Sequence, residues 1–300
     1  MKAYQNSKTV LLFGREFAEG FRDSFRLLIN RLQKYGARIY IFEPFEKFIR
    51  CSIPDMPVID GTYSTYEDLR NIGGVMLSIG GDGTFLEAIT FVRDLPVPLA
   101  GINCGRLGFL ADISQEEISS AVDTVMHDSG KKEELTLIRV ACDQPLFGDL
   151  NFALNEITVH KRDDSSMIRI HASLNGEFLN TYWADGLIVS TPTGSTAYSL
   201  SVGGPLVLPG TGNLILSPIA PHNLTVRPLV YNDSMELSLR VESRSGNLLV
   251  SADSRSVVID HSLELHITKA PFRITTIRLR EHGFYQTLRS KLMWGADKRN

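Results

Sequence analysis

The sequence has few cysteines, no long hydrophobic run and almost no excess of charge. Its three cysteines, Cys51, Cys104 and Cys142, are far apart and odd in number, which favours reduced thiols over a disulfide framework. No segment approaches the ~20 apolar residues needed to span a bilayer. The first residues contain only a four-residue apolar run, too short for the core of a signal peptide. We therefore expect a soluble, cytoplasmic protein with no membrane partner.

Charge and composition narrow the class of protein further. The 31 basic and 34 acidic residues leave a net charge of -3, without the basic stripe that nucleic-acid binding needs. We expect no nucleic-acid partner. The apolar fraction of 43% over 300 residues is enough for one large core or two ordinary ones.

The first third of the chain alternates strand and helix signals. Apolar runs at 9–14, 37–42, 74–79 and 97–102 are typical of buried strands, and helical patterns lie between and after them. Ser114 followed by Glu117 has the spacing of a capping box, which predicts a helix over 114–128. Strands that are apolar on both faces and separated by helices indicate a parallel sheet covered by helices. We expect an α/β domain over residues 1–128.

The pattern changes after residue 128. Short runs rich in β-branched residues follow one another closely, separated by turn signals such as NG, DG and GG. They predict an all-β domain over 129–281, built as a layered β-sandwich. Phe284, Leu288 and Leu292 then stand at helical spacing, and we expect this last helix, within 282–300, to return to the first domain.

The glycine turn GGDGT, at 80–84, follows a predicted strand and precedes a helix. Thr84 can cap that helix, with Glu87 completing a capping box. The helix start would offer free N–H groups and a partly positive end to a phosphate, and the glycines would let it come close. Asp82 would repel a phosphate unless a metal ion lay between them or the carboxylate bound a hydroxyl group instead. A hydroxyl group next to a phosphate is the arrangement needed for phosphoryl transfer. An ordinary tight turn explains the same residues.

A second glycine loop, GINCGRLGFL at 101–110, follows the next strand. Neither the Gly-x-Gly-x-x-Gly pattern nor the Walker A pattern occurs in the chain, so the commonest explanations of such turns are absent. Two glycine loops behind successive strands suggest a shared crevice. Arg106 could meet a phosphate there, but we favour a solvated loop cation.

Hydroxyl groups are densest between residues 185 and 207. Neutral donors and backbone amides can bind a pyrophosphate or a purine edge, and Tyr198 could stack on a base. The same residues could form only a Ser/Thr turn and a capped helix, and Asp185-Gly186 only a hairpin turn. Asn155-Glu156 could bind the hydroxyls of a ribose, or could be a polar pair at a strand edge.

Taken together, these stretches resemble the NAD kinase family. The motifs that match, in order, are GGDGT at 80–84, GINCGRLGFL at 101–110, Asn155-Glu156, Asp185-Gly186-Leu187, TPTGSTAY at 191–198 and SPIAPHNLTVRPLV at 217–230. GGDG alone also occurs in phosphofructokinases and lipid kinases, whereas the 185–205 block with the other motifs is specific. The resemblance implies transfer of a phosphoryl group, usually from ATP with a divalent metal, to the adenosine 2′-hydroxyl of NAD.

The resemblance also implies roles for individual residues. Asp82 would orient the hydroxyl and accept its proton, and Gly83 would lie against the substrate. Asn155 and Glu156 would hold adenosine and ribose groups, and Asp185 would contact the nicotinamide half. The dinucleotide pocket would be lined by Thr193, Thr196, Ala197, Tyr198 and Ser201, with a further contact from Asp253. No metal site made of protein side chains is implied, magnesium being the expected ion, and the assembly would be a homodimer or homotetramer.

Three positions depart from the family pattern or invite another role. Asp253-Ser254 stands where members often have Asp-Gly, and Trp183 stands where some carry a basic residue. His222 is better explained as a brace for its loop than as a chemical group. Two other functions compete with the kinase: a lipid or sugar kinase sharing the GGDG turn, and a dinucleotide sensor without catalysis.

Overall fold

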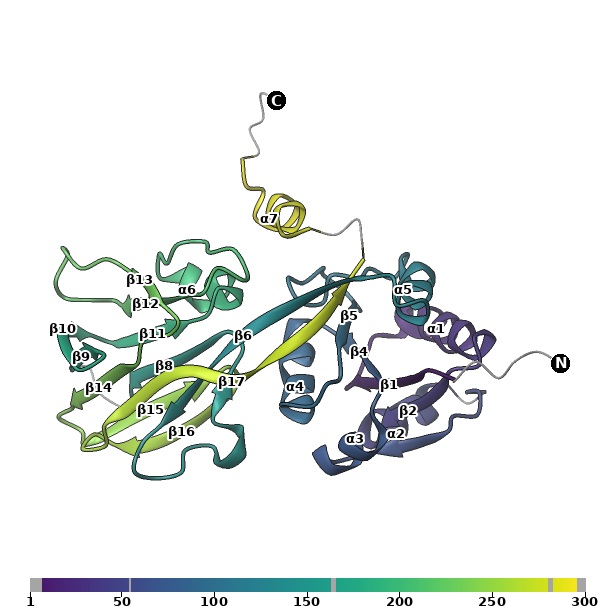
Figure 1. Cartoon of the computed structure of the whole chain (residues 1–300), viewed down its shortest axis with the longest axis horizontal. Coiled ribbons are helices and arrows are strands. Elements are labelled where there is room, and N and C mark those ends of the chain that lie inside the picture. Colours follow the sequence, from purple (N-terminus) through teal and green to yellow (C-terminus); the bar gives the residue numbers. More distant parts are fainter. Residues whose placement is uncertain (1–6, 54, 163–165, 280–282, 296–300) are drawn as a thin grey trace. The chain divides into compact units, whose positions relative to one another are not determined.

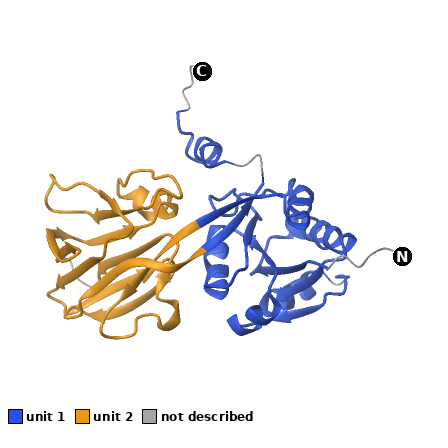
Figure 2. Cartoon of the chain, in the orientation of Figure 1, with its two compact units in different colours: residues 1–134, 274–300 blue, residues 135–273 orange. Residues whose placement is uncertain are grey.

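The computed structural model describes residues 7–53, 55–162, 166–279 and 283–295. The chain divides into two compact units, one formed by Met1–Glu134 with Ile274–Asn300 and the other by Leu135–Arg273 (Figure 2). Two long strands, β6 (Lys131–Ala141) and β17 (Leu265–Arg278), contain the two division points. The helix α7 (Phe284–Leu292) belongs to the first unit, as the C-terminal pattern predicts.

The first unit is built on a parallel sheet with helices on both sides of its strands (Figure 1). The strands follow the order β5-β4-β1-β2-β3, and the end of β17 joins β5 in parallel through Thr276 and Leu99. The predicted strands are confirmed, and the short β3 is an addition. Their bounds are β1 Thr9–Gly14, β2 Arg38–Phe42, β3 Gly61–Tyr63, β4 Val75–Gly80 and β5 Leu99–Asn103.

The helices of this unit bury one apolar face each. In α1, Phe25, Leu28 and Leu32 are fully buried at helical spacing, and Phe21 precedes them in a short 3-10 turn. α1 packs beside α5, and α3 beside α4. The bounds are α1 Arg22–Lys34, α2 Glu43–Ser52, α3 Tyr66–Ile72, α4 Asp82–Val92 and α5 Ile118–Met126.

The register of the parallel strands places both glycine loops at one sheet edge. Gly80, the last residue of β4, pairs with Asn103, the last residue of β5. On the other side of β4, Ile79 pairs with Gly14 at the end of β1. Carboxyl ends of parallel strands form the usual ligand crevice of such a sheet.

The second unit consists of two layered sheets, which confirms the predicted β-sandwich. One sheet contains β10-β9-β14-β17, with β6 and the short β7 attached, and the other follows the order β13-β12-β11-β8-β15-β16. Apolar residues from both sheets form one core. The remaining strand bounds are β7 Phe152–Ala153, β8 Glu156–Lys161, β9 Ile168–Leu174, β10 Glu177–Ala184, β11 Gly186–Ser190, β12 Asn213–Ile219, β13 Leu229–Asn232, β14 Leu237–Glu242, β15 Asn247–Ala252 and β16 Arg255–Asp260.

Two local expectations are wrong. Asp185-Gly186 is not a hairpin turn, because β10 pairs with β9 in one sheet while β11 pairs with β8 and β12 in the other. The helix predicted over 114–128 begins only at Ile118, although the Ser114 N–H does donate to Glu117 Oε2 at 2.9 Å. Within the described residues, no helix is long and apolar enough to cross a membrane.

Candidate active site

The GGDGT turn joins the end of β4 to the first turn of α4. Asp82 is the first residue of the helix, and the N-cap position is Gly81, which makes no side-chain cap. The first-turn amides therefore lack the usual capping partner. A methyl group added at Gly81 or Gly83 would meet nothing within 4 Å, so the space beside this backbone is open. The turn has the form of an anion site at a helix N-terminus.

The capping box predicted for Thr84 and Glu87 is wrong. Thr84 lies inside the first turn, because the N-cap of α4 is Gly81, three residues earlier than the sequence pattern indicates. Glu87 instead accepts a hydrogen bond at 3.0 Å from Nε of Arg15, the residue that follows the end of β1. The missing cap leaves the helix start free for another acceptor.

The Asp82 carboxylate binds the second glycine loop. Its Oδ2 accepts the N–H of Phe109 at 2.9 Å, and its Oδ1 accepts those of Leu110 at 3.0 Å and Ala111 at 2.9 Å. Hydrogen bonds from N–H groups to an ionised carboxylate are among the stronger ones in proteins. The two glycine loops, separate in sequence, therefore meet at this one side chain.

Gly108 makes this contact possible. A Cβ at this position would lie 1.8 Å from Asp82 Oδ1, so the carboxylate would have to move to make room for any side chain. The rest of the loop is held by Asn103, whose Oδ1 accepts the Gly105 N–H at 2.6 Å and whose Nδ2 donates to the Arg106 carbonyl. Arg106 itself is exposed, in keeping with a solvated cation.

In the second unit, Asn155 and Glu156 stand at the start of β8. Their neighbour in the sheet is the end of β11, where Ser190 pairs with Glu156. Gly194 packs on this point so closely that a Cβ would lie 2.2 Å from the Asn155 carbonyl oxygen. The Asn155-Glu156 pair and the hydroxyl-rich loop are thus brought together.

The hydroxyl groups of this loop divide into two sets. Thr191, Ser195 and Ser199 are completely buried and bond to the fold: Thr191 Oγ1 donates to the Leu154 carbonyl at 2.5 Å, for example. The other set keeps some exposure, in the turn Thr193–Thr196 (η3) and the short helix α6 (Tyr198–Ser201). It comprises the hydroxyls of the predicted pocket residues Thr193, Thr196, Tyr198 and Ser201, and the predicted Ala197 lies among them, also partly exposed.

The Asp253 carboxylate binds the backbone of the Asn155-Glu156 pair. Its carboxylate accepts the N–H groups of Leu154, Asn155 and Glu156 at 2.9, 2.8 and 3.2 Å, and its side chain is only 6% exposed. It lies in the two-residue turn between β15 and β16 with φ 51, whereas Ser254 needs no positive φ. Serine in place of glycine therefore causes no strain here.

Glu156 is the most perturbed acid of this region. Burial is the largest cause, and the nearby Asp253 carboxylate adds to it, so that the pKa of Glu156 rises to about 7. The backbone N–H of Tyr198 opposes the shift in part. Glu156 Oε2 is buried and has no hydrogen-bond partner among the described residues. A donor from a ligand, such as a ribose hydroxyl, would satisfy this oxygen.

Asp185 is not brought to this group. It precedes β11, whose other end carries the hydroxyl-rich loop, and its Oδ1 pairs with Lys161 Nζ at 2.7 Å. At about 3.4 Å per residue, the strand separates Asp185 from Ser190 by roughly 17 Å. All five residues of β11 are buried. A ligand held at Asn155 cannot lie along this strand to reach Asp185.

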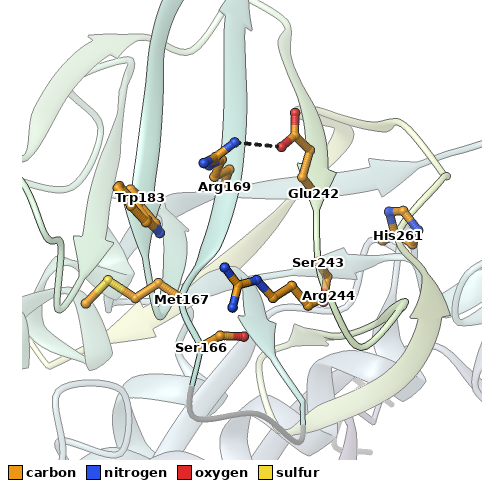
Figure 3. Close-up of a pocket in the computed structure, with 8 residues that line it drawn as sticks. All are labelled: Ser166, Met167, Arg169, Trp183, Glu242, Ser243, Arg244 and His261. Atoms are coloured by element: carbon orange, nitrogen blue, oxygen red, sulfur yellow. Dashed lines mark hydrogen bonds and ion pairs between the residues drawn. The ribbon is translucent and has the colours of Figure 1, made fainter.

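A hollow of about 560 Å³ lies elsewhere in the second unit (Figure 3). Its residues come from distant parts of the sequence, so no local motif announces it. Arg169 pairs with Glu242 at 3.4 Å and lies 5.3 Å from the centre of the Trp183 ring. None of the predicted site residues lines it; the lining comprises Ser166, Met167, Arg169, Trp183, Glu242, Ser243, Arg244 and His261.

His222 braces its loop, as expected. Its backbone N–H donates to the Trp183 carbonyl at 2.8 Å, and the two rings lie 4.9 Å apart. Among the described residues, no group of three or more His, Cys, Asp or Glu side chains is arranged to hold a metal ion.

We predict that Glu156→Gln gains stability relative to the parent as pH rises. The raised pKa of Glu156, about 7 against ~4.3 when unfolded, means that its favourable contribution is complete below ~4.3 and is lost as pH passes 7. Glutamine does not ionise. Urea denaturation at pH 4.5 and 8 gives the unfolding free energy of each protein. Relative to the parent, the variant should be more stable at pH 8 than at pH 4.5 by on the order of 1–3 kcal/mol.

The control is Glu177→Gln, at an exposed position on β10. The difference in unfolding free energy between this variant and the parent should be the same at both pH values. A difference at Glu156 that is equally flat between the two pH values would contradict the raised pKa.

Comparison with known proteins places this geometry in a family. The profile of the ATP-NAD kinase N-terminal domain matches residues 56–130, and that of the C-terminal domain matches residues 154–279. The chain is 48% identical to an NAD kinase of Cytophaga hutchinsonii over 96% of its length and 99% of that protein. It is 45% identical to an NAD kinase of Flavobacterium psychrophilum, over 95% and 98%.

Solved structures agree with these matches. The fold is similar to that of a yeast NADH kinase complexed with NADH, with a TM-score of 0.86 at 23% identity, over 98% of this chain and 90% of the other. An NAD kinase from Archaeoglobus fulgidus in complex with ATP gives a TM-score of 0.73 at 26% identity, over 94% and 99%. The chain therefore belongs to the NAD kinase family and is a phosphotransferase.

Proposed function

We propose that the chain transfers the terminal phosphoryl group of ATP to the adenosine 2′-hydroxyl of NAD, giving NADP and ADP. The observation that carries this proposal is the Asp82 carboxylate at an open glycine turn, beside uncapped helix amides. These are the two elements that such a transfer needs: an acceptor for a hydroxyl proton and a seat for phosphate oxygens. The family of the chain supports the same reaction.

Asp82 acts on the hydroxyl mainly by orienting it. Its hydrogen bonds to Phe109, Leu110 and Ala111 stabilise the ionised carboxylate, which accepts the 2′-O–H. The O–P bond to the donor breaks as the bond to the 2′-oxygen forms, and the hydroxyl proton passes to the carboxylate late in the step. In a loose transition state, positioning contributes more than the strength of the base. Gly83 leaves the substrate room beside the turn.

The second unit would bind the dinucleotide. Asn155 and Glu156 accept and donate hydrogen bonds to adenosine and ribose, and the unpaired Glu156 Oε2 takes a ribose hydroxyl. Thr193, Thr196, Ala197, Tyr198 and Ser201 line the pocket with the exposed set of groups. Asp253 supports binding through the Leu154–Glu156 backbone rather than by touching the ligand, because its side chain is only 6% exposed.

Magnesium would enter as the complex with ATP. Mg²⁺ usually keeps several waters and is held by substrate phosphates with one or two carboxylates. The described residues include no cluster of three or more His, Cys, Asp or Glu side chains that could hold a metal ion. We therefore propose that the nucleotide phosphates supply most of the ligands of the ion. The ion would neutralise charge on the phosphates. We propose that the reaction takes place in the cytoplasm.

A homodimer or homotetramer would complete the site. Asp185 lies about one β11 length from the adenosine residues of its own copy, across a buried strand. We propose that it contacts the nicotinamide half of a dinucleotide bound to another copy.

Asp82→Asn tests the catalytic role. We predict a loss of turnover of ~10²–10⁴-fold, because the amide cannot accept the hydroxyl proton. NADP formation from NAD, ATP and magnesium is followed by mass spectrometry, which should show one added phosphate on the adenosine side for the parent. Binding of NAD should stay close to that of the parent, whereas the melting temperature should fall, because the amide cannot accept all three N–H groups of the second glycine loop. Turnover at the parental rate would remove Asp82 from catalysis.

Gly108→Ala tests the close approach of the second loop. The added Cβ would collide with Asp82 Oδ1, so we predict a fall in kcat of ~10²-fold from displacement of the carboxylate. Gly105→Ala is the matched control in the same loop, since a Cβ there meets nothing within 4 Å. Equal kcat values for the two variants would show that the position of Asp82 does not depend on Gly108.

Complementation between copies tests the role of Asp185. Asp82→Asn and Asp185→Asn should each be nearly inactive, and co-expression should restore activity because one site of a mixed pair receives neither substitution. Random pairing in a dimer should restore about a quarter of the parental activity. If Asp185 acts within its own copy, co-expression will restore nothing.

A further inference from the structure

One buried cation lies behind the loop that holds Asp82. Arg278, the last residue of β17, donates from Nη2 to the Phe109 carbonyl at 3.2 Å and from Nη1 to Asp112 Oδ2 at 2.5 Å. Its Nε donates to Glu133 Oε2 at 2.9 Å. The side chains of Arg278 and Asp112 are 8% and 4% exposed. All of these residues belong to the first unit.

The contacts of Arg278 and Asp82 converge on one peptide group. Arg278 binds the carbonyl oxygen of Phe109, and the N–H on the same peptide bond, that of Leu110, donates to Asp82 Oδ1. The guanidinium, the peptide and the carboxylate thus form a continuous chain of hydrogen bonds. A cation at the carbonyl end polarises the peptide and strengthens its N–H as a donor.

The geometry of arginine suits this position. A guanidinium is planar, and its N–H groups point in fixed directions toward several acceptors at once. A buried arginine must be paired, and the Asp112 and Glu133 carboxylates supply the charge. The Phe109 carbonyl is neutral, so it adds little to charge balance. Its place in the arrangement fixes the orientation of the 109–110 peptide.

We propose that Arg278 is a positioning residue for Asp82, acting through the Phe109–Leu110 peptide. The inference rests on the catalytic role proposed for Asp82. Arg278 touches no part of the open turn; it sets the direction of the amides that hold the carboxylate. Moving the reacting group by about 1 Å can lower a rate by ~10²-fold, so the effect belongs to kcat rather than to binding.

Arg278→Lys is the test variant, because lysine keeps the charge that Asp112 and Glu133 require but lacks the planar fork. We expect kcat to fall by ~10–100-fold, with the KM values for NAD and ATP changed by less than about threefold. In the Asp82→Asn background the same change should cause no further loss, since Arg278 acts only through that carboxylate. An unchanged kcat, or an equal loss in both backgrounds, would overturn the proposal.

Arg31→Lys is the matched control. Arg31 lies in the same unit and joins α1 to α5, where its Nη2 donates to Asp123 Oδ1 at 2.8 Å and Oδ2 at 2.7 Å, away from the loop. The Arg31→Lys variant should have a lower melting temperature than the parent but the same kcat. A comparable fall in kcat for Arg31→Lys would mean that Arg278 acts only through general stability.

Hydrogen exchange separates this inference from the function proposed for the site. The Phe109–Ala111 amides should exchange at least ~10-fold faster in Arg278→Lys than in the parent, whatever reaction Asp82 supports. Unchanged protection would overturn the positioning role even if Asp82→Asn is inactive. Faster exchange together with an active Asp82→Asn would leave Arg278 holding the loop and would refute the catalytic role of Asp82 alone.

Discussion

A carboxylate that accepts three successive backbone N–H groups is the interaction on which the first unit's site depends. Asp82 begins α4, while its partners Phe109–Ala111 lie beyond β5. This contact joins two loops that the parallel register only brings to the same edge. It also explains Gly108, because no side chain fits between the loop and the carboxylate. The placement of the Asp82 carboxylate follows from backbone geometry rather than from side-chain packing.

The second unit uses the same device for a different end. Asp253 also binds three successive amides, those of Leu154–Glu156, yet it is almost fully buried. Asp82 stands beside open space at the glycine turn. The difference in burial separates the two roles: one carboxylate can meet a ligand, and the other can only shape the backbone that does. Burial raises the pKa of Asp253, and its three amides act in the opposite direction.

Local patterns predicted much of this from sequence, and long-range contacts account for what they missed. The alternation of strands and helices, the sandwich and the glycine turn all follow from periodicity and turn chemistry within short windows. The prediction of a cap at Thr84 was wrong because the sequence pattern of a capping box does not distinguish a capped helix start from an uncapped one. The division of the hydroxyl groups depends on burial against Leu154 and its neighbours. Arg278 lies more than 160 positions from its partners Phe109 and Asp112, beyond any local window.

Long-range contacts also give Glu156 and Asp82 different surroundings. Glu156, at the start of β8, is enclosed beside a second carboxylate and keeps one oxygen without a donor. Each such oxygen costs free energy until a ligand supplies a hydrogen bond. The oxygens of Asp82, in contrast, both accept N–H groups. A ligand that donates a hydrogen bond to Glu156 Oε2 would therefore gain binding free energy there.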